Sequence, residues 1–191
     1  MKNKDLVKKV KDICDVKTLY VQGASGEFLS KANKLRLSSS TPFNSTRSAK
    51  IFATGEDVMA FDELGLISYA TNKNFKNYGQ LLECCIDISK DFSDITDGEI
   101  VFMKDRAGVY VGDGQVITAS LDGVGITTVK GWISHGKLKN VDFTVDPEPV
   151  VEEVVEETPE VEAEPVEEIK EHVEKKESNM VVRGNKFRNR H

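Results

Sequence analysis

The spacing of apolar residues changes once along this chain, and the change sets the fold class. In the first half, apolar residues recur at helical intervals, in residues 4–16 and again after Asp62. After Asp97 and Gly98 the segments become short, rich in β-branched residues and separated by glycines, as is typical of strands. Helices followed by an antiparallel sheet are the pattern of α+β domains, so we predict an α+β fold.

Individual elements follow from the same spacing and from residues that begin helices or form turns. The segments predicted to be helical are 4–16, a helix that begins near Asp62, 75–86, and a short stretch within 45–53. The segments predicted to be extended are 18–21, 99–104, 108–111, 115–119 and 126–129, with a hairpin turn at Gly112-Asp113-Gly114. The remainder of 26–55 is rich in serine, asparagine, lysine and threonine, which predicts an irregular surface segment.

The composition changes again beyond Phe143. Residues 146–177 contain 14 acidic residues and three lysines, with repeated Val-Glu units and several prolines, whereas residues 178–191 are basic. Such a sequence cannot bury enough apolar surface to offset the entropy lost when a chain becomes ordered. We therefore predict a folded domain over 1–145 and a disordered acidic tail over 146–191 that ends in a short basic segment.

Charge and hydropathy exclude several classes of function. Because the acidic residues concentrate in the tail, residues 1–145 are nearly neutral and lack the basic surplus typical of nucleic-acid binding. No apolar run reaches the ~20 residues of a membrane span, and the N-terminus does not continue into a signal-peptide core. We expect synthesis in the cytoplasm, without a signal peptide and without membrane insertion.

The cysteines and histidines do not form a disulfide or metal framework. There are three cysteines, and two of them, Cys84 and Cys85, are adjacent in an apolar stretch, where free cysteine packs as a small hydrophobic residue. Two of the three histidines lie in the predicted tail, so no metal-binding spacing exists and no cofactor is expected. A catalytic pair of Cys84 or Cys85 with His135 is the less favoured alternative.

Two segments, 61–67 and 106–112, have the spacing of a cysteine peptidase active site without its reacting groups. In such sites the cysteine opens a helix, whose N-terminus lowers the pKa of the thiol, and a histidine begins the facing strand. Here Glu63 occupies the nucleophile position and Arg106 the histidine position. Because a glutamate and an arginine carry the charges of a thiolate and an imidazolium, we predict an ion pair between them; the alternative is that both face solvent.

The order of these and other motifs resembles the NlpC-type family of papain-like bacterial cell-wall cysteine peptidases, and within it the phage lysins of Gram-positive hosts. The resemblance covers residues 1–145. The motifs that carry it are Tyr20-Val21-Gln22-Gly23, Phe61-Asp62-Glu63-Leu64-Gly65-Leu66-Ile67, Asp97-Gly98-Glu99-Ile100-Val101-Phe102, Gly108-Val109-Tyr110-Val111-Gly112-Asp113-Gly114 and Trp132-Ile133-Ser134-His135-Gly136-Lys137-Leu138.

The resemblance also implies roles for single residues. It places the third polar group of the catalytic set at Thr118, so all three family positions are substituted, whereas Tyr20, near the oxyanion site, is retained. The expected binding residues are Tyr20, Glu63, Arg106 and Trp132, although the tryptophan serves a core equally well. The Asp62 and Glu63 carboxylates are adjacent at a helix start, which favours a capping role for Asp62 over a glycosidase pair.

The favoured hypothesis is a catalytically inactive peptidase-like protein, encoded by a phage and made in the host cytoplasm. It would act as a module that binds the stem peptide of peptidoglycan, or as a virion or structural component that binds another phage or host protein. The first alternative is an active cell-wall endopeptidase or amidase with non-standard catalytic residues. The second is an interaction protein, unrelated to peptidoglycan, that binds through its acidic tail.

Overall fold

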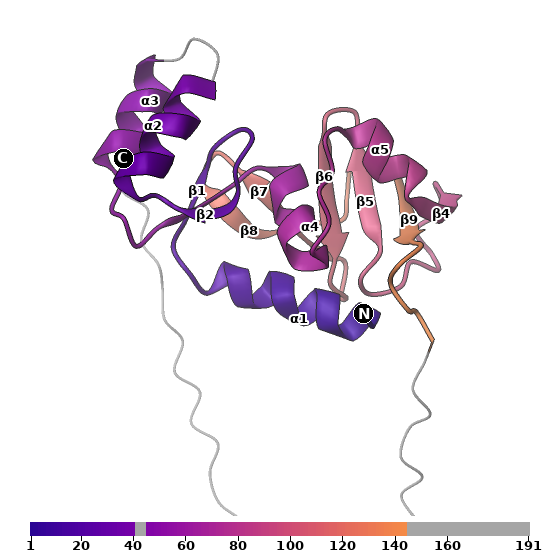
Figure 1. Ribbon diagram of the computed structural model, residues 1–191. Helices are drawn as coiled ribbons and strands as arrows, with labels where there is room; N and C mark the ends of the chain where they lie inside the picture. The colour runs from indigo at the N-terminus through magenta and orange to yellow at the C-terminus, as the bar shows by residue number, and fades with distance from the viewer. Residues whose placement is uncertain (41–44, 145–191) are drawn as a thin grey trace, which may run out of the picture. The chain divides into compact units, whose positions relative to one another are not determined.

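The computed structural model describes residues 1–40 and 45–144, and the predicted α+β class is confirmed (Figure 1). The expectations for the acidic tail and the basic end lie outside these residues, and the predicted boundary after residue 145 stays a prediction. Among the described helices, none is both long enough and apolar enough to cross a membrane.

The larger sheet has six antiparallel strands in the order β4-β9-β5-β6-β7-β8. Its strands are β4 (Cys85–Ser89), β5 (Ile100–Met103), β6 (Arg106–Tyr110), β7 (Gln115–Ser120), β8 (Gly123–Thr128) and β9 (Ser134–Leu138). The predicted turn between β6 and β7 is confirmed, with Gly112, Asp113 and Gly114 all at positive φ. This backbone conformation is accessible to glycine and, at some cost, to aspartate, which explains the sequence at the turn.

A second sheet has three short strands: β1 (Thr18–Tyr20), β2 (Ser25–Phe28) and β3 (Met59–Phe61). β3 lies in the middle, parallel to β1 and antiparallel to β2. Of these three strands, only β1 is predicted from the sequence. By pairing with β3, which leads directly into the helix that begins at Glu63, residues 18–20 are placed beside the start of that helix.

The helices agree with prediction at three places and differ at two. They are α1 (Asn3–Cys14), α2 (Lys31–Ser40), α3 (Ser45–Ala53), α4 (Glu63–Thr71) and α5 (Tyr78–Glu83). The prediction of an irregular segment over 26–55 is wrong where β2 and α2 form. The predicted helix over 75–86 ends at Glu83, because Cys85 and Ile86 pair with β9 and continue the chain as an edge strand.

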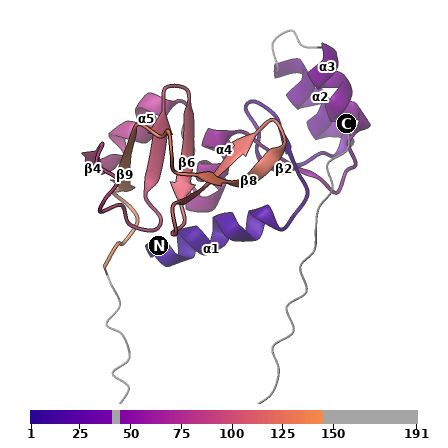
Figure 2. The same cartoon turned by 180° about the vertical axis from the view of Figure 1, so that it is seen from behind.

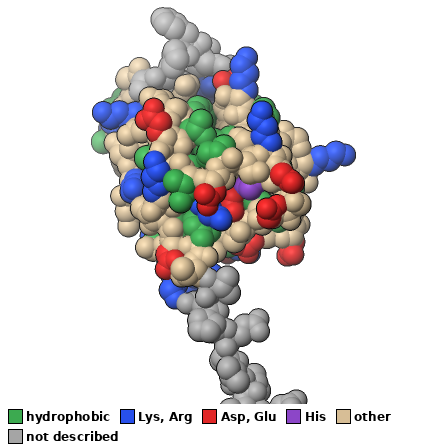
Figure 3. Space-filling model, turned by 90° about the vertical axis from the view of Figure 1, so that its right-hand side faces the viewer, with side chains coloured by type: hydrophobic (Ala, Val, Ile, Leu, Met, Phe, Trp, Pro, Cys, Tyr) green, Lys and Arg blue, Asp and Glu red, His purple; other side chains and the backbone are tan. Residues whose placement is uncertain are grey.

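Helices α1 and α4 pack against one face of the six-stranded sheet (Figures 1 and 2). The main core lies between them, and its largest fully buried side chains include Leu6, Phe61, Leu66, Ile67 and Ile117. Val101, Val116 and Trp132 form a smaller cluster on the opposite face of the sheet. The side of the molecule that carries β4, β9 and α5 leaves apolar side chains exposed, among them Leu82, Ile86, Ile88 and Ile133 (Figure 3).

The N-terminus of α4 is held in place by Asp62, as the sequence predicts. One carboxylate oxygen accepts a hydrogen bond from the Gly65 amide (2.6 Å) and caps the helix. The other accepts from the Gly23 amide (2.6 Å), in the connection between β1 and β2. Gly65 lies so close to the Ala24 carbonyl that a Cβ would collide with it, so the helix start and this connection form one rigid unit.

Replacing Asp62 tests how strongly this unit depends on the cap. Asp62→Ala removes both hydrogen bonds and should lower the free energy of unfolding by about 1–2 kcal/mol, because one lost cap costs about 1 kcal/mol. Asn77→Ala is the matched control, since the Asn77 side chain caps α5 through one bond to the Gln80 amide (2.9 Å). Urea unfolding of both variants should show the larger decrease in the free energy of unfolding for Asp62→Ala. Equal decreases would contradict a stabilising role for the hydrogen bond between Asp62 and the Gly23 amide.

Candidate functional site

The Glu63 carboxylate is the centre of a polar cluster at the start of α4. One of its oxygens accepts hydrogen bonds from the hydroxyls of Tyr20 (3.1 Å) and Tyr78 (3.4 Å). The other lies 3.7 Å from the Arg106 Nε at the start of β6. Four elements, β1, α4, α5 and β6, therefore converge on a single carboxylate.

The predicted ion pair between Glu63 and Arg106 is confirmed. The Glu63 side chain is 8% exposed, whereas the Arg106 side chain is 41% exposed, so solvent screens one partner and reaches the other only slightly. At 3.7 Å and with such an exposed arginine, the pair contributes little to stability, as is usual for ion pairs at surfaces. The main effect of the ion pair is to hold the Arg106 guanidinium at the edge of an open cleft.

Burial dominates the electrostatics of the cluster. It raises the pKa of the Glu63 carboxyl above its ordinary value, while the Tyr20 hydroxyl and the Arg106 charge act in the opposite direction. Burial also raises the pKa of Tyr20 to about 12, and the neighbouring Glu63 charge adds to this shift. The pKa of Tyr78 is raised for the same two reasons. Both phenols therefore remain hydrogen-bond donors at neutral pH.

A cleft of about 430 Å³ opens above the cluster. It is lined by Tyr20, Arg47, Glu63, Arg106 and residues 120–122. Arg47 comes from α3, and Lys50 of the same helix approaches the Leu121 carbonyl (3.4 Å), so α3 and the turn between β7 and β8 meet at the rim. The lining combines two arginines, the buried Glu63 carboxylate, the Asp122 carboxylate and two hydroxyls, which is the polar set of a ligand site rather than that of a core.

The residues that line the cleft include no cysteine and no histidine, and the hydroxyl of its serine, Ser120, donates a hydrogen bond to the Gly123 carbonyl (3.4 Å). Cys85 lies on the edge strand β4, where its thiol approaches the Leu81 carbonyl (3.4 Å) and burial raises its pKa to about 12. The expectation of a buried structural cysteine is confirmed for Cys85. His135 does not face it: the register of β4 and β9 pairs Cys85 with Leu138, and the His135 ring contacts Glu99 and Asp91.

Two of the expected site residues lie outside the cluster. Thr118 is buried, and its hydroxyl donates to the Ala107 carbonyl (2.7 Å) in the neighbouring strand rather than reaching the Arg106 side chain. Trp132 packs with Val101 and Val116, and its indole N–H donates to the Thr128 carbonyl (3.2 Å). The structure therefore brings Tyr20, Glu63 and Arg106 together and places Thr118 and Trp132 elsewhere.

Two residues of the site were not predicted from the sequence. Tyr78 follows the α5 cap, Asn77, and nothing in its local spacing indicates a contact with a residue 15 positions earlier. Arg47 lies on a helix that the sequence placed in a surface segment. Within the residues that the structure describes, no group of three or more His, Cys, Asp or Glu side chains is arranged to hold a metal ion.

No protein-family model matches this chain, and no match was found among curated proteins. Among solved structures, the chain is similar to NlpC1 from Trichomonas vaginalis, with 20% identity, a TM-score of 0.47, and coverage of 71% of this chain and 44% of that chain. It is also similar to the peptidoglycan hydrolase RipB from Mycobacterium tuberculosis, with 16% identity, a TM-score of 0.46, and coverage of 71% and 63%. The chain spans less than two thirds of either protein.

The raised pKa of the Glu63 carboxyl predicts how the stability of the chain depends on pH. Because folding raises the pKa of this carboxyl, ionised Glu63 destabilises the folded chain above that pKa, and this cost disappears below the ordinary glutamate value of ~4.3. Glu63→Gln should therefore be at least as stable as the original chain at neutral pH, and the difference should shrink toward about pH 4. Denaturant unfolding across pH measures both quantities.

The opposite pattern would contradict this account of the site. If Glu63→Gln is clearly less stable at neutral pH and recovers in acid, then the ion pair with Arg106 outweighs the burial of the carboxylate. Circular dichroism at each pH verifies that the variant keeps its secondary structure.

Proposed function

We propose that this chain is a catalytically inactive, peptidase-like module that binds a peptide of the bacterial cell wall in the cleft above Glu63 without cleaving it. The observation that carries the proposal is the pairing of Glu63 with Arg106 at 3.7 Å. These residues occupy the nucleophile and proton-shuttle positions in the NlpC-type pattern that the sequence resembles. The frame around them, Asp62 and Gly65, keeps its structural contacts.

The chemistry of the pair argues against hydrolysis. A carboxylate with two tyrosine hydroxyls on one oxygen and an arginine near the other is a hydrogen-bond acceptor, not an available nucleophile. A guanidinium keeps its proton at all ordinary pH values, so Arg106 cannot serve as a general base. The buried thiol of Cys85 lies in β4, at the edge of the sheet, and argues against an active lysin with that residue as its nucleophile.

The same groups favour binding of a peptide that carries carboxyl and amide groups. Arg106 is partly exposed and lines the cleft together with Arg47, while the Tyr20 ring adds an apolar surface. Guanidinium groups bind carboxylates through charge-assisted, often bidentate, hydrogen bonds. The stem peptide of peptidoglycan is the ligand that the sequence resemblance indicates. A phage or virion protein that presents an acidic peptide is the second candidate.

A binding assay with purified cell walls tests the proposal. We expect the full chain to co-sediment with peptidoglycan, to produce no clearing zone in a zymogram, and to lose affinity by about tenfold or more in Arg106→Gln, since a lost charged contact costs about 1.5–3 kcal/mol. Arg36→Gln is the matched control, because Arg36 forms a surface ion pair with Glu27 outside the cleft lining. Retained binding in Arg106→Gln, or a clearing zone, would contradict the proposal.

Introducing the cysteine and histidine of the family pattern tests whether the backbone around the cleft can still activate a thiol. In the double variant Glu63→Cys with Arg106→His, the new thiol lies at the N-terminus of α4, where the helix dipole and a nearby imidazole lower a thiol pKa. We expect iodoacetamide to modify this thiol at neutral pH much faster than it modifies any thiol of the original chain. A modification rate no faster than that of the original thiols would show that the cleft has changed beyond these two side chains.

A further inference from the structure

A second hollow, the α5 hollow, lies beside the Glu63 cleft, between α5 and the larger sheet. Its volume is about 280 Å³. Five of its eight lining residues are apolar or aromatic: Tyr78, Leu82, Phe102, Met103 and Ile133. Phe102 is buried, whereas Leu82 and Ile133 are half exposed. The α5 hollow therefore leaves apolar surface in contact with solvent.

The strand register places the α5 hollow and the Glu63 cleft at the same end of the six-stranded sheet. Phe102 in β5 pairs with Ser134 at the start of β9, and Met103 at the end of β5 pairs with Arg106 at the start of β6. β7 runs antiparallel to β6, so its last residue, Ser120, which lines the cleft, lies at this end too. The two hollows therefore follow one another across the strand ends, the α5 hollow at β9 and β5 and the cleft at β6 and β7.

The Tyr78 side chain connects the two hollows. It lines the α5 hollow, and its hydroxyl donates a hydrogen bond to the Glu63 carboxylate (3.4 Å), which lines the cleft. A volume of about 280 Å³ lies just below the range of about 300–1,000 Å³ that holds a whole small ligand. The α5 hollow therefore fits one side chain of a ligand whose remainder lies in the adjoining cleft.

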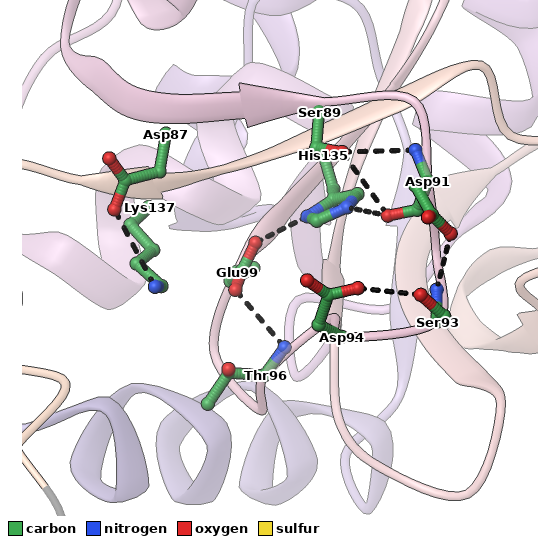
Figure 4. A network of polar contacts seen from close by, with 9 residues as sticks. All are labelled: Asp87, Ser89, Asp91, Ser93, Asp94, Thr96, Glu99, His135 and Lys137. Carbon is green, nitrogen blue, oxygen red and sulfur yellow. Dashed lines mark hydrogen bonds and ion pairs between the residues drawn. The ribbon is translucent and has the colours of Figure 1, made fainter.

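The opposite face of β9 is covered by the protein itself. Successive side chains of a strand point to opposite faces, so His135 points away from the hollow that Ser134 lines. The His135 ring contacts the Glu99 carboxylate and the Asp91 carbonyl (Figure 4). The Phe92 ring packs on the imidazole with 4.9 Å between ring centroids. The open apolar surface at this end of β9 is therefore on the side of α5.

The charges around the two hollows indicate what kind of ligand fits them. The charged residues that line them are Arg47, Lys104, Arg106, Glu63 and Asp122. Glu63 already accepts hydrogen bonds from two tyrosine hydroxyls and pairs with Arg106, so the other three charges are two cations and one anion. Carboxylates suit this lining, and an extended peptide supplies both carboxylates and apolar side chains.

The distance between neighbouring strands sets the spacing of the two ligand groups. Strands lie ~4.8 Å apart, so the middle of a hollow lined by β5 and β9 is about 7 Å from β6, which Arg106 begins. Two residues of an extended peptide span about 6.6 Å, and side chains two positions apart point to the same face. A carboxylate and an apolar side chain at this spacing reach Arg106 and the α5 hollow together.

We propose that the α5 hollow is a second subsite of the Glu63 cleft, and that the ligand is an extended acidic peptide. In this peptide a large apolar side chain lies two positions from the carboxylate that Arg106 binds. The inference rests on the proposed binding of a peptide in the cleft and adds a requirement for the sequence of that peptide. The apolar side chain covers Leu82 and Ile133 and removes their exposed surface from water.

Titration of the full chain with blocked pentapeptides, followed by methyl NMR, tests the subsite. The probes are Gly-Leu-Gly-Glu-Gly, the reversed order Gly-Glu-Gly-Leu-Gly, and the same two peptides with alanine in place of leucine. We expect one leucine peptide to bind about tenfold or more tightly than its alanine version, because burial of the larger side chain is favourable. It should also shift the methyl signals of Leu82 and Ile133, and Arg106→Gln should weaken its binding by about tenfold or more.

Two double variants separate the α5 hollow from exposed apolar surface in general. Leu82→Ser with Ile133→Thr should bind the leucine and alanine peptides alike. Ile86→Thr with Ile126→Thr is the matched control, because these isoleucines line neither hollow and are 45% and 57% exposed, against 43% and 53% for Leu82 and Ile133. The control should keep the preference of the original chain, and circular dichroism verifies that both variants are folded.

The outcomes distinguish this inference from the proposed function. Equal affinity for the leucine and alanine peptides, with both weakened in Arg106→Gln, would overturn the subsite and leave peptide binding in the cleft intact. A leucine preference with affinities that Arg106→Gln does not change would overturn both proposals. Methyl signals of Leu82 and Ile133 that do not shift with any peptide would overturn the subsite.

Analytical ultracentrifugation of the same proteins tests whether a second copy of the chain covers the α5 hollow instead. We expect the original chain and both double variants to sediment alike. A dimer of the original chain that dissociates in Leu82→Ser with Ile133→Thr, but not in the control, would overturn the peptide subsite.

Discussion

The candidate site depends on the way in which the N-terminus of α4 is fixed to the connection between β1 and β2. Asp62 accepts hydrogen bonds from both segments, and the absence of a side chain at Gly65 lets the helix backbone approach the Ala24 carbonyl. These contacts fix the backbone at Glu63, the first residue of the helix. Its carboxylate lies between β1 and β6, where Tyr20 and Arg106 meet it.

A helix start that stabilises a thiolate also stabilises a carboxylate, since the unpaired amides and the dipole act on negative charge of either kind. This explains how a glutamate fits, without disrupting the surrounding contacts, at the position that the sequence resemblance assigns to a cysteine nucleophile. The cost is desolvation, which raises the pKa of the Glu63 carboxyl despite the help of its neighbours. A buried carboxylate whose desolvation is not fully compensated by its neighbours is more typical of a functional site than of a position selected for stability.

The parts of this structure that the sequence predicted are those determined by local chemistry. The Asp62 cap, the turn at Gly112 and Gly114, and the strand segments after Gly98 depend on residues within a few positions of one another. The parts that were missed depend on long-range pairing: the edge strand β4 needs β9, about 50 residues later. Tyr78 reaches Glu63, and His135 reaches Glu99, only because sheet and helices bring distant segments together. His135 was considered as a partner for a cysteine, and its register shows why that partner is wrong.

The two polar clusters of this domain differ in their access to solvent. The Glu63 cluster ends in an arginine that is 41% exposed at a cleft, so part of its hydrogen-bonding capacity is available to a ligand. The Glu99 and His135 cluster is closed, and each of its ring nitrogens and carboxylate oxygens has a partner within the protein. A closed cluster cannot take a ligand without breaking a bond to its own chain. Glu99 and His135 therefore hold the connection between β4 and β5, whereas Arg106 stays accessible from the cleft.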